Sequence, residues 1–455
     1  MEGRATASVR VDGAPAEATL GGGELRWRRA GGGGGAAGER VLSLERDVLG
    51  VEASGKEVIV RAFVAAGAAR ARSCASGAGA GGKGVGRRRR RDFVLEMADG
   101  EGAAAALFVF VNPFGGRKCA KKIYDTEIKP LFEAAGVSIT VQETEYQGHA
   151  REVASSLDLG KYDGIVCVSG DGVLVEVVNG ILQRTDWEEA IKMPIGVVPA
   201  GTGNGMAKSL LHAASETCSV SNAVFAIIKG HKQSLDVCTI LQGEKKFFSV
   251  LLMTWDIESE KYRWMGSARF DFYFVPAPGY ESYGEPVKQV ENSIVESLEQ
   301  NGKSHPSSYP GPSVEFQASD WRFADGPFVA VWINDVPWAA EDVMAAPEAK
   351  HHDTIILRDC PKADLLALLM KMSDGSYVKS PYVTYLKVRS FKLSLGQLVE
   401  NPKRGGIIDV DGEVIARGDG TYGKDRHQDM MAYGPPIQLT VHQALATIYG
   451  PNRIR

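Results

Sequence analysis

The stretch from Asp163 to Leu182, DGIVCVSGDGVLVEVVNGIL, constrains the fold more than any other part of the chain. Its first half holds the apolar, β-branched run Ile165 to Val168 between two glycines, which predicts a short strand buried on both faces. In its second half, apolar side chains recur at helical spacing, at positions 173, 177, 178 and 181. The stretch therefore predicts a strand that passes through a short turn into a helix.

The turn itself, Ser169-Gly170-Asp171-Gly172, carries the first chemical signal. Glycines at the start of a helix allow backbone N–H groups to face an anion. A carboxylate between them would repel phosphates unless a cation or a proton transfer involves it, so we interpret the turn as a phosphoryl-acceptor site with its own base, Asp171. The alternative is a structural turn in which Asp171 only caps the helix.

Length and composition set the remaining limits. A chain of 455 residues predicts two or three domains, and a net charge of −4 gives no overall attraction to nucleic acid, so we expect no nucleic-acid partner. No apolar run is long enough to span a bilayer, and no signal peptide is expected. The cysteines form no Cys-x-x-Cys pair and are interpreted as reduced thiols; they are Cys74, Cys119, Cys167, Cys218, Cys238 and Cys360.

Residues 1–100 differ from the rest by their glycine-rich patches. Short strand-like pieces lie between these patches and predict a β-rich module, with a pleckstrin-homology-like domain as one interpretation; the pieces are Thr6 to Val11, Glu24 to Trp27, Arg40 to Leu44 and Val58 to Val64. The run Arg87 to Arg91 is interpreted as a solvated loop, and a contact with anionic lipid headgroups is the alternative.

The next region alternates strands and helices, which predicts a parallel α/β sheet. Strands are expected at Leu107 to Val111, Val137 to Val141 and Ile195 to Val198, and helices from the residues after Arg117 to about Ala135 and at Ala150 to Leu157. Glycine-rich loops follow three strands, and in open sheets such loops converge on one crevice. The loops match neither the dinucleotide fingerprint nor a Walker sequence, so a nucleotide site here would be of a third kind.

The order of the motifs resembles a known family of lipid kinases. Asn112-Pro-x-Gly-Gly, Thr144-Glu145, Ser169-Gly-Asp-Gly-x-x-x-Glu-x-x-Asn-Gly180 and Pro199-Ala-Gly-Thr-Gly-Asn204 look like the diacylglycerol-kinase-type catalytic domain. Asp256-Ile-Glu-Ser-Glu-Lys-Tyr-Arg263, Trp264-Met-Gly-Ser-Ala-Arg269 and Asp409-Val-Asp-Gly-Glu413 resemble sphingosine (long-chain-base) kinases, most closely those of plants. The resemblance covers roughly residues 107–449.

The resemblance implies an α/β nucleotide domain like that of phosphofructokinases and NAD kinases, followed by an antiparallel β domain that holds the lipid. We expect these units at residues 107–233 and 234–430, with an insertion at 276–320, and expect 437–449 to pack back on the α/β unit. Strand-like runs after Ser234 agree: Phe247 to Thr254, Arg269 to Val275, Phe328 to Ile333 and Thr354 to Arg358, with a helix at Ala363 to Met372.

The resemblance also implies a reaction and its residues. Asp171 would take the proton from the primary hydroxyl of a sphingoid base as that hydroxyl attacks the γ-phosphate of ATP, with Mg²⁺ as cofactor. Ser169, Gly170, Asp171, Gly172 and Asp256 would bind the lipid, whose amine Asp256 would recognise. Asp411 and Glu413 are candidates for holding Mg²⁺ directly or through water. The nucleotide would contact Asn112, Pro113, Phe114, Thr144, Glu145, Tyr146, Glu176, Gly201, Thr202, Gly203, Arg263, Arg269, Asp411, Gly412 and Glu413.

Several departures from the family pattern keep alternatives open. Phe114 stands where relatives often carry arginine, and the junctions at 106/107, 255/256 and 353/354 are shorter than in relatives. Because strand side chains alternate, the shortened junction before Asp256 could turn its carboxylate to the other face. The alternatives are a ceramide or diacylglycerol kinase, or a catalytically impaired, membrane-associated variant. We expect a cytoplasmic protein attached peripherally to intracellular membranes, and a homodimer is left open.

Overall fold

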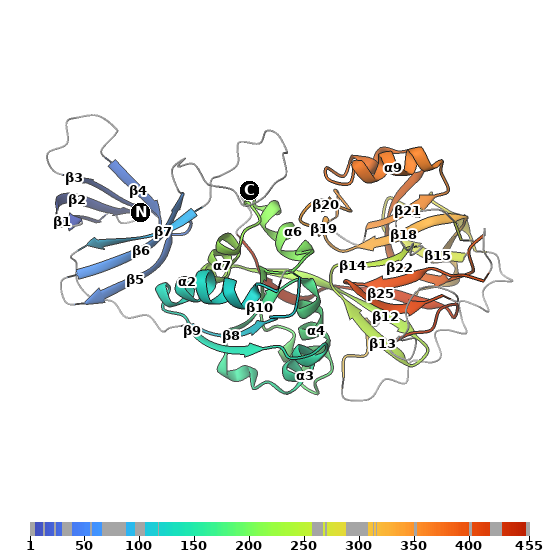
Figure 1. Cartoon of the computed structure of the whole chain (residues 1–455), viewed down its shortest axis with the longest axis horizontal. Coiled ribbons are helices and arrows are strands. Elements are labelled where there is room, and N and C mark those ends of the chain that lie inside the picture. The colour runs from blue at the N-terminus through green and yellow to red at the C-terminus, as the bar shows by residue number, and fades with distance from the viewer. Residues whose placement is uncertain are drawn as a thin grey trace.

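The computed structural model describes most of the chain: residues 5–11, 14–21, 24–29, 39–54, 57–65, 88–95, 105–116, 118–256, 267–268, 271–287, 308–312, 314, 316–349, 353–399, 403–418 and 430–451. Figure 1 shows three regions in a row. A β-rich N-terminal region lies at one end, and a second β-rich region, formed by the C-terminal part of the chain, lies at the opposite end. Helices surround parallel strands in the middle. No helix in the described residues is long and apolar enough to cross a bilayer.

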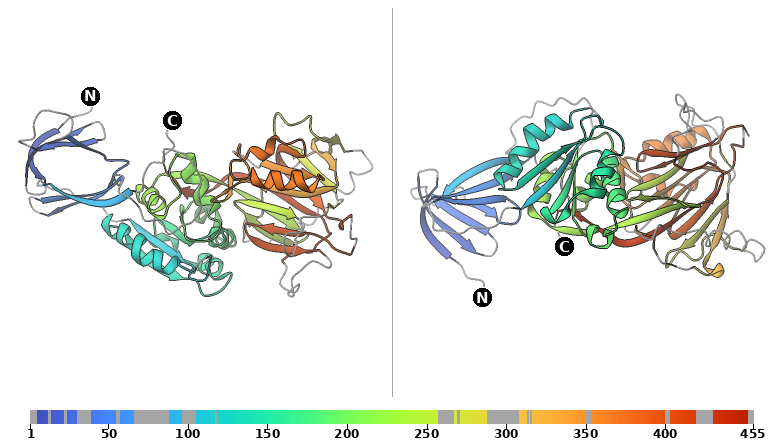
Figure 2. Two further views of the ribbon diagram at one scale, coloured as in Figure 1. Left: turned by 45° about the horizontal axis from the view of Figure 1, so that its top comes forward. Right: turned by 90° about the horizontal axis from the view of Figure 1, so that it is seen from below.

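The N-terminal region is a seven-stranded antiparallel sheet in the order β4-β3-β2-β1-β7-β6-β5. Figure 2 shows that this sheet is strongly curved. Trp27, Leu42 and Val60 belong to the small core that it encloses. Its strands are β1 (Ala5–Val11), β2 (Ala14–Gly21), β3 (Glu24–Arg29), β4 (Glu39–Ser43), β5 (Val48–Ser54), β6 (Glu57–Ala65) and β7 (Arg88–Leu95). The predicted β-rich start is confirmed, whereas the pleckstrin-homology comparison stays a prediction.

The interpretation of the arginine run as a loop was wrong. Arg88–Leu95 forms β7, and its backbone pairs with β6 from Ala65↔Arg88 to Val58↔Leu95. Consecutive arginines carry no period-2 pattern, so only the pairing with a neighbouring strand reveals this element. β2, with the sequence APAEATLG, was also missed: its apolar residues do alternate, but most of them are alanines, which have a low β propensity.

The middle region contains four parallel strands in the order β9-β8-β10-β11. β10 (Gly164–Ser169) is buried at every residue, as expected for a central strand covered on both faces. The other strands are β8 (Ala106–Val111), β9 (Ser138–Glu143) and β11 (Ile195–Pro199). The surrounding helices are α1 (Ala120–Ile123), the π-turn η2 (Tyr124–Ile128), α2 (Lys129–Ala134), α3 (His149–Ser156), the 3₁₀ turn η3 (Leu159–Lys161), α4 (Asp171–Leu182), α5 (Trp187–Ala190), α6 (Gly205–Ala213) and α7 (Val220–Lys229).

The second β-rich region follows directly from α7. Its elements are β12 (Lys232–Gln242), β13 (Lys245–Ser249), β14 (Leu252–Asp256), β15 (Asp271–Pro276), β16 (Glu285–Pro286), η5 (Ala318–Asp320), β17 (Arg322–Asp325), β18 (Phe328–Asn334), β19 (Trp338–Ala340), β20 (Val343–Met344), β21 (Asp353–Arg358), α9 (Lys362–Met370), η6 (Ser376–Lys379), β22 (Val383–Ser394), β23 (Ile407–Val410), β24 (Glu413–Arg417) and β25 (Ile437–Tyr449). The predicted fold class, an α/β core followed by a β-rich region, is confirmed. The domain boundaries stay a prediction.

β25 joins the two regions into one sheet. It pairs antiparallel with β12 and β22, and near its end Ile448 pairs with Ile195 of β11 in parallel. Tyr449 then donates a hydrogen bond from its hydroxyl to the Asp163 carbonyl oxygen at 2.8 Å. The parallel strands are therefore continuous with the antiparallel ones.

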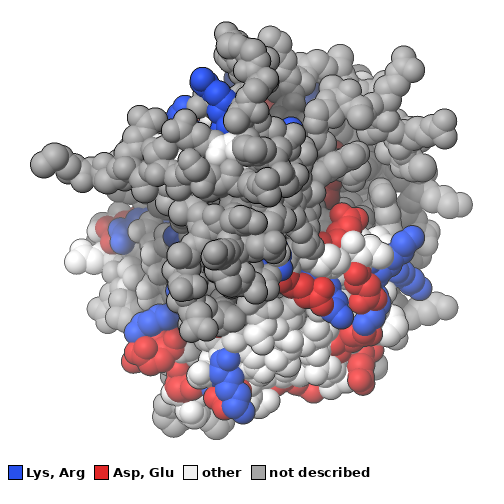
Figure 3. Space-filling model, turned by 90° about the vertical axis from the view of Figure 1, so that its left-hand side faces the viewer, with Lys and Arg blue, Asp and Glu red and all other residues white. Residues whose placement is uncertain are grey.

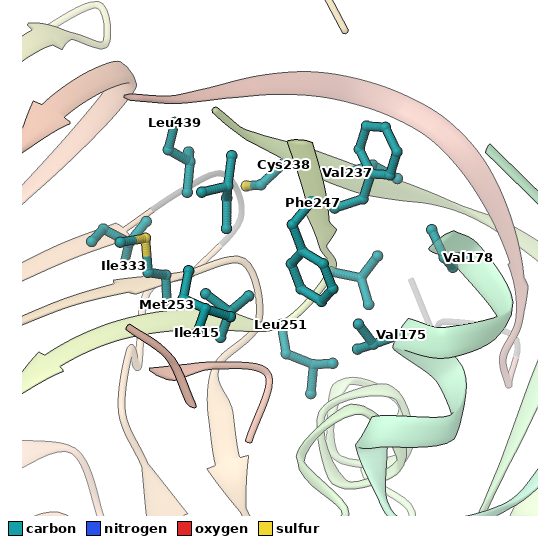
Figure 4. Packing of buried hydrophobic residues seen from close by; sticks show 14 of the residues in the cluster. Val175, Val178, Val237, Cys238, Phe247, Leu251, Met253, Ile333, Ile415 and Leu439 are labelled. Carbon is teal, nitrogen blue, oxygen red and sulfur yellow. The ribbon is translucent and has the colours of Figure 1, made fainter. Parts of the chain in front are cut away.

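The main hydrophobic core also spans both regions. Figure 4 shows Val175 and Val178 of α4 facing Phe247 and Leu251 from the other region. Met253, Ile333, Ile415 and Leu439 extend the same cluster into the antiparallel strands. This shared core fixes how α4 lies against the β-rich strands.

The N-terminal sheet meets the middle region through the turn between β4 and β5. Lys229 Nζ, at the end of α7, donates hydrogen bonds to the Leu44 and Val48 carbonyl oxygens at 2.6 and 2.5 Å. Leu49 is buried in the core of the middle region. Figure 3 views the molecule from this N-terminal end, where the coloured acidic and basic side chains are interleaved.

Candidate active site

Three glycine-containing loops meet at the carboxyl ends of β8, β10 and β11. A Cβ on Gly201 would lie 2.2 Å from the Gly170 Cα, and a Cβ on Gly116 would lie 2.8 Å from the Gly201 carbonyl carbon. Only glycine permits backbones to approach this closely, and Gly116 also has a φ of 53°. The loops therefore converge as the sequence predicted.

A cleft with a volume of about 950 Å³ opens between these loops and the β-rich strands. It brings together Asn112, Ser169, Gly170, Asp171, Gly172, Glu176, Gly201, Thr202, Gly203, Asp411, Gly412 and Glu413 from the predicted set. Gly115, Gly116 and Asp409, which belong to the quoted motifs, also line the cleft, together with Gln147, Arg151 and Arg417, which the sequence did not single out. The cleft thus combines glycine loops, carboxylates and two arginines.

Asp171, the first residue of α4, is held in place by hydrogen bonds to another element. Its two oxygens accept hydrogen bonds from the backbone N–H groups of Gly205 at 2.7 Å and Met206 at 3.0 Å. Burial raises the pKa of Asp171 above its usual range, while these two N–H donors act in the opposite direction. Each oxygen keeps a lone pair, so the carboxylate is oriented and can accept a proton. The capping alternative is half right, because Asp171 does bind the start of a helix, but that helix is α6.

Asn204 holds the third glycine loop in shape. It adopts the left-handed backbone conformation, with a φ of 57°, and its Oδ1 accepts a hydrogen bond from the Gly201 N–H at 2.9 Å. Its Nδ2 donates to Glu341 Oε1 at 2.7 Å, between β19 and β20. The glycine loop is thereby tied to the β-rich region across the cleft.

Asn112 organises the first loop in a similar way. Its Oδ1 accepts hydrogen bonds from the Phe114 and Gly115 N–H groups at 3.0 and 3.1 Å, and its Nδ2 donates to Ser169 Oγ at 3.3 Å. Asn112 therefore links the first loop to the turn that carries Asp171.

Glu176 lies in the cleft but has a structural function as well. Its carboxylate accepts hydrogen bonds from the N–H groups of Gly148 at 2.9 Å and Ala150 at 3.0 Å, and so caps the start of α3. This cap places the Gly148 to Arg151 turn against the cleft. Glu176 thus helps to shape the cleft by holding the start of α3 in place.

Five predicted nucleotide residues do not line the cleft: Pro113, Phe114, Thr144, Glu145 and Tyr146. Thr144 is buried, whereas Phe114 and Tyr146 are 62% and 51% exposed. The Tyr146 hydroxyl donates to Glu152 Oε2 at 2.7 Å, and its ring stacks on His149. The contact of these five residues with a nucleotide stays a prediction.

Asp411 braces the cleft wall. Its Oδ1 accepts hydrogen bonds from the Ser249 hydroxyl at 3.0 Å and from the Leu251 and Leu252 N–H groups at 3.0 and 2.7 Å. Its Oδ2 accepts from the Val250 N–H at 2.9 Å. These bonds fold the single predicted strand from Phe247 to Thr254 into two strands, β13 and β14, which corrects that prediction.

A magnesium ion fits Glu413 better than Asp411. Four donors already surround the Asp411 oxygens. Burial raises the pKa of Glu413, a hydrogen bond with Gln147 lowers it, and the negative charges of Glu176 and Asp409 raise it. The same negative charges would attract a cation toward Glu413. Among the described residues no three metal-binding side chains converge, so the phosphates of a bound nucleotide would have to complete the coordination of Mg²⁺.

Comparison with known proteins places the chain in a family. The sequence profile of the diacylglycerol kinase catalytic domain matches residues 106–240. Sphingosine kinase 2 of Arabidopsis thaliana is 45% identical, with 98% of this chain and 97% of that protein covered. Sphingosine kinase 1 of Arabidopsis thaliana is 51% identical, with 76% and 75% covered. The chain belongs to the sphingosine kinase family.

More distant relatives agree with this assignment. Human sphingosine kinase 1 is 30% identical, with 68% of this chain and 86% of that protein covered. A solved structure of a Bacillus anthracis protein described as a diacylglycerol kinase is 14% identical, covers 78% of this chain and all of its own, and superposes with a TM-score of 0.50. This last likeness concerns the fold alone.

For three residues to which the family resemblance assigns a function, the structure does not describe the side chain. Arg263 and Arg269 lie outside the described residues. Asp256 ends β14, where its backbone pairs with Ala330 and Ile407, but its side chain lies outside the described part. The direction of its carboxylate after the shortened junction therefore stays a prediction.

Proposed function

We propose that this chain transfers the γ-phosphoryl group of ATP to the primary hydroxyl of sphingosine and related sphingoid bases, giving the 1-phosphate. Membership of the sphingosine kinase family supports the reaction class. The observation that carries the proposal is Asp171, a partly buried carboxylate held by two backbone N–H groups where three glycine loops meet.

Asp171 acts as the general base in this proposal. The Gly205 and Met206 N–H groups fix its oxygens, so that a lone pair can face a hydroxyl that enters the cleft. Phosphoryl transfer depends mainly on positioning and on stabilisation of charge, with a base to accept the proton of the hydroxyl. A pKa raised by burial makes the carboxylate a better proton acceptor than an exposed aspartate.

The glycine loops and the arginines hold the nucleotide. Gly116, Gly170 and Gly201 allow phosphates to approach the backbone closely, and Arg151 and Arg417 supply positive charge in the same cleft. We assign Arg263 and Arg269 to the same task from the family pattern. Mg²⁺ would neutralise phosphate charge during transfer, with Glu413 and Asp409 as its candidate protein partners.

Asp256 recognises the lipid amine in this proposal. A cationic amine beside a carboxylate selects a sphingoid base over uncharged diacylglycerol or ceramide. Support comes from the position of β14, which pairs with β23, the strand that carries Asp409. We also propose peripheral attachment to intracellular membranes from the cytoplasm, because the substrate is a bilayer lipid.

The decisive experiment measures Mg²⁺-dependent transfer of labelled γ-phosphate from ATP to sphingosine, diacylglycerol and ceramide. Labelling of sphingosine alone, with a loss of about 10²–10⁴-fold in Asp171→Asn, is the expected result. Labelling of all three lipids would point to the broader lipid kinase instead. No labelling by folded protein that binds ATP would point to the catalytically impaired variant.

A second variant tests the lipid site separately. Asp256→Asn should weaken the use of sphingosine selectively, because the amide carries no charge to pair with the amine. Lys261, in the same motif, offers a matched charge-removing control as Lys261→Gln. Equal loss of activity on every lipid in Asp256→Asn would contradict the assigned specificity.

A further inference from the structure

The helix α9 (Lys362–Met370) presents apolar side chains on both of its sides. Leu365 and Leu368 are buried and face the β-rich region, as the helical spacing requires. On the opposite side, Leu366 is 61% exposed and Met370 77% exposed, and the exposed Ala363 and Ala367 complete this face. Amphipathic surface helices normally direct polar residues outward, so this outer face requires an explanation.

The exposed side chains of Leu366 and Met370 are neighbours on the helix surface. They lie four residues apart, which places them one above the other on the same face of the helix. Met370 is the most exposed large apolar side chain among the described residues. Figure 1 shows α9 along the top of the second β-rich region, on its outer surface.

Positive charge flanks this face on both sides. Lys362 precedes Leu366 by one turn, and Lys371 follows Met370 directly, so the two lysines lie to either side of the apolar face. The acidic residue of the helix, Asp364, lies against the Tyr382 hydroxyl, whose pKa its charge raises. An apolar strip between lysines fits a bilayer with anionic headgroups, where the strip enters the acyl boundary and the lysines reach phosphates.

The inner side of α9 connects this face to the proposed lipid site. Leu365 and Leu368 pack in one cluster with Ala330 of β18, and the Ala330 backbone pairs with Asp256. The Met372 carbonyl oxygen, just after the helix, accepts a hydrogen bond from the Met344 N–H of β20 at 2.8 Å. β20 pairs with β19, whose Ala339 lines the cleft. The inner side of α9 thus packs on β18, the direct neighbour of the strand that ends in Asp256.

We propose that the outer face of α9, formed by Ala363, Leu366, Ala367 and Met370, is the surface by which this chain docks on anionic lipid bilayers. Leu366 and Met370 insert, and Lys362 and Lys371 contact the headgroups. The helix lies in the plane of the membrane and does not span it. The docking claim stands on α9 alone, whereas its link to substrate delivery rests on the proposed function.

The test is flotation of the full chain with vesicles of phosphatidylcholine and phosphatidylserine that contain no sphingosine. Leu366→Glu/Met370→Glu should lower the vesicle partition coefficient about a hundredfold, because both inserted side chains are lost and negative charge is added. Lys362→Gln/Lys371→Gln should weaken binding to anionic vesicles and leave weak binding to pure phosphatidylcholine unchanged. Val141→Glu, on an exposed position of β9, is the matched control and should bind like wild type.

Kinase activity supplies a second readout. The Leu366→Glu/Met370→Glu variant should phosphorylate sphingosine in detergent micelles as wild type does, and lose activity at least tenfold when sphingosine is presented in anionic vesicles. If wild type itself labels no sphingosine in micelles, the proposed function fails, and the flotation result still decides docking. Unchanged flotation of the double variant overturns the proposal. A wild-type dimer that the variant converts to monomer, with flotation unchanged, would show that a second copy covers this face.

Discussion

Carboxylates in the cleft carry different functions because their surroundings differ. Asp171 accepts two backbone N–H groups at the start of α6 and keeps free lone pairs, Glu176 caps α3, and Asp411 is enclosed by four donors. All three belong to motifs that a sequence reading assigns to substrate or nucleotide. Their hydrogen-bond partners distinguish Asp171, the proposed base, from Glu176, which caps a helix, and from Asp411, which holds a loop.

The pH dependence of the reaction should report Asp171. A general base acts only when deprotonated, and burial raises the pKa of Asp171, so kcat/KM should fall as pH decreases through a value above the usual range of aspartate. In Asp171→Asn the residual activity should lose this acid limb. The measurement is kcat/KM for sphingosine against pH, with the exposed Asp125→Asn as a control. An identical acid limb in Asp171→Asn would contradict the assignment.

Asp411 should be required for stability and not primarily for chemistry. In Asp411→Asn either orientation of the amide sets its NH₂ group against backbone N–H donors, so the free energy of unfolding should fall by about 3 kcal/mol. Chemical denaturation at constant pH measures this change. Asp409→Asn, whose carboxylate accepts one hydrogen bond from the Gly412 N–H at 2.8 Å, should cost less.

The same residue predicts how stability responds to pH. Burial raises the pKa of Asp411 to about 7 in the folded protein, above its unfolded value of about 4. The folded state therefore holds this proton more tightly, and the contribution of Asp411 to stability should decline as pH rises from about 4 to 7. The stability gap between wild type and Asp411→Asn should consequently be larger at pH 5.5 than at pH 8. A gap that widens with pH would contradict the raised pKa.

At the scale of elements, the site is made by turns at strand ends. The loops after β8, β10 and β11 touch because Gly116, Gly170 and Gly201 have no side chains, and Asn204 fixes the third loop. No single strand of the three forms the site. The parallel register, such as Cys167 beside both Phe110 and Val197, brings the three turns to one edge.

Two glycine substitutions should show whether ATP binding depends on the close contact between the loops or only on the presence of glycine in them. Gly201→Ala would place a Cβ 2.2 Å from the Gly170 Cα and should push the loops apart, with ATP affinity lowered at least tenfold while the fold persists. Gly172→Ala meets no atom within 4 Å and lies in the first turn of α4, so it should keep or raise stability by about 0.5–1 kcal/mol. ATP titration and thermal unfolding of both variants measure the difference. Equal ATP affinity in the two variants would contradict the close packing of the loops.

At the scale of the whole molecule, β25 makes the middle and second β-rich regions interdependent. It is central to the antiparallel strands and also pairs with β11, and its Ile437, Leu439, Ala446 and Ile448 are buried in the shared core. The cleft lies between these two regions and depends on how they are held together.

We therefore expect residues 105–451 to unfold in one cooperative transition. Deleting 437–455 should abolish that transition, because a central strand and part of the core are lost. Tyr449→Phe, which removes only the hydrogen bond to the Asp163 carbonyl oxygen, should cost about 1 kcal/mol and keep a single transition. Two separate transitions in calorimetry of wild-type residues 105–451 would contradict this coupling.

The sequence by itself determined the elements whose signal is local. The strand, turn and helix from Asp163 to Leu182, the glycine loops and the α/β order could all be read from apolar periodicity and turn residues, because those depend on neighbouring positions. The family resemblance also came from short ordered motifs, and the nucleotide contacts that it implies for Pro113, Phe114 and Tyr146 stay a prediction.

Tertiary structure decided the features that depend on distant partners. Asp411 bends the β13–β14 segment from 160 positions away, Asn204 reaches Glu341, and the arginines of β7 are ordered by pairing with β6. A hydrogen-bond donor or a neighbouring strand so far along the chain leaves no periodic pattern at the residue that it acts on. Many residues of the cleft could therefore be anticipated from the sequence, whereas the hydrogen bonds that distinguish Asp171 from Glu176 and Asp411 could be seen only in the folded chain.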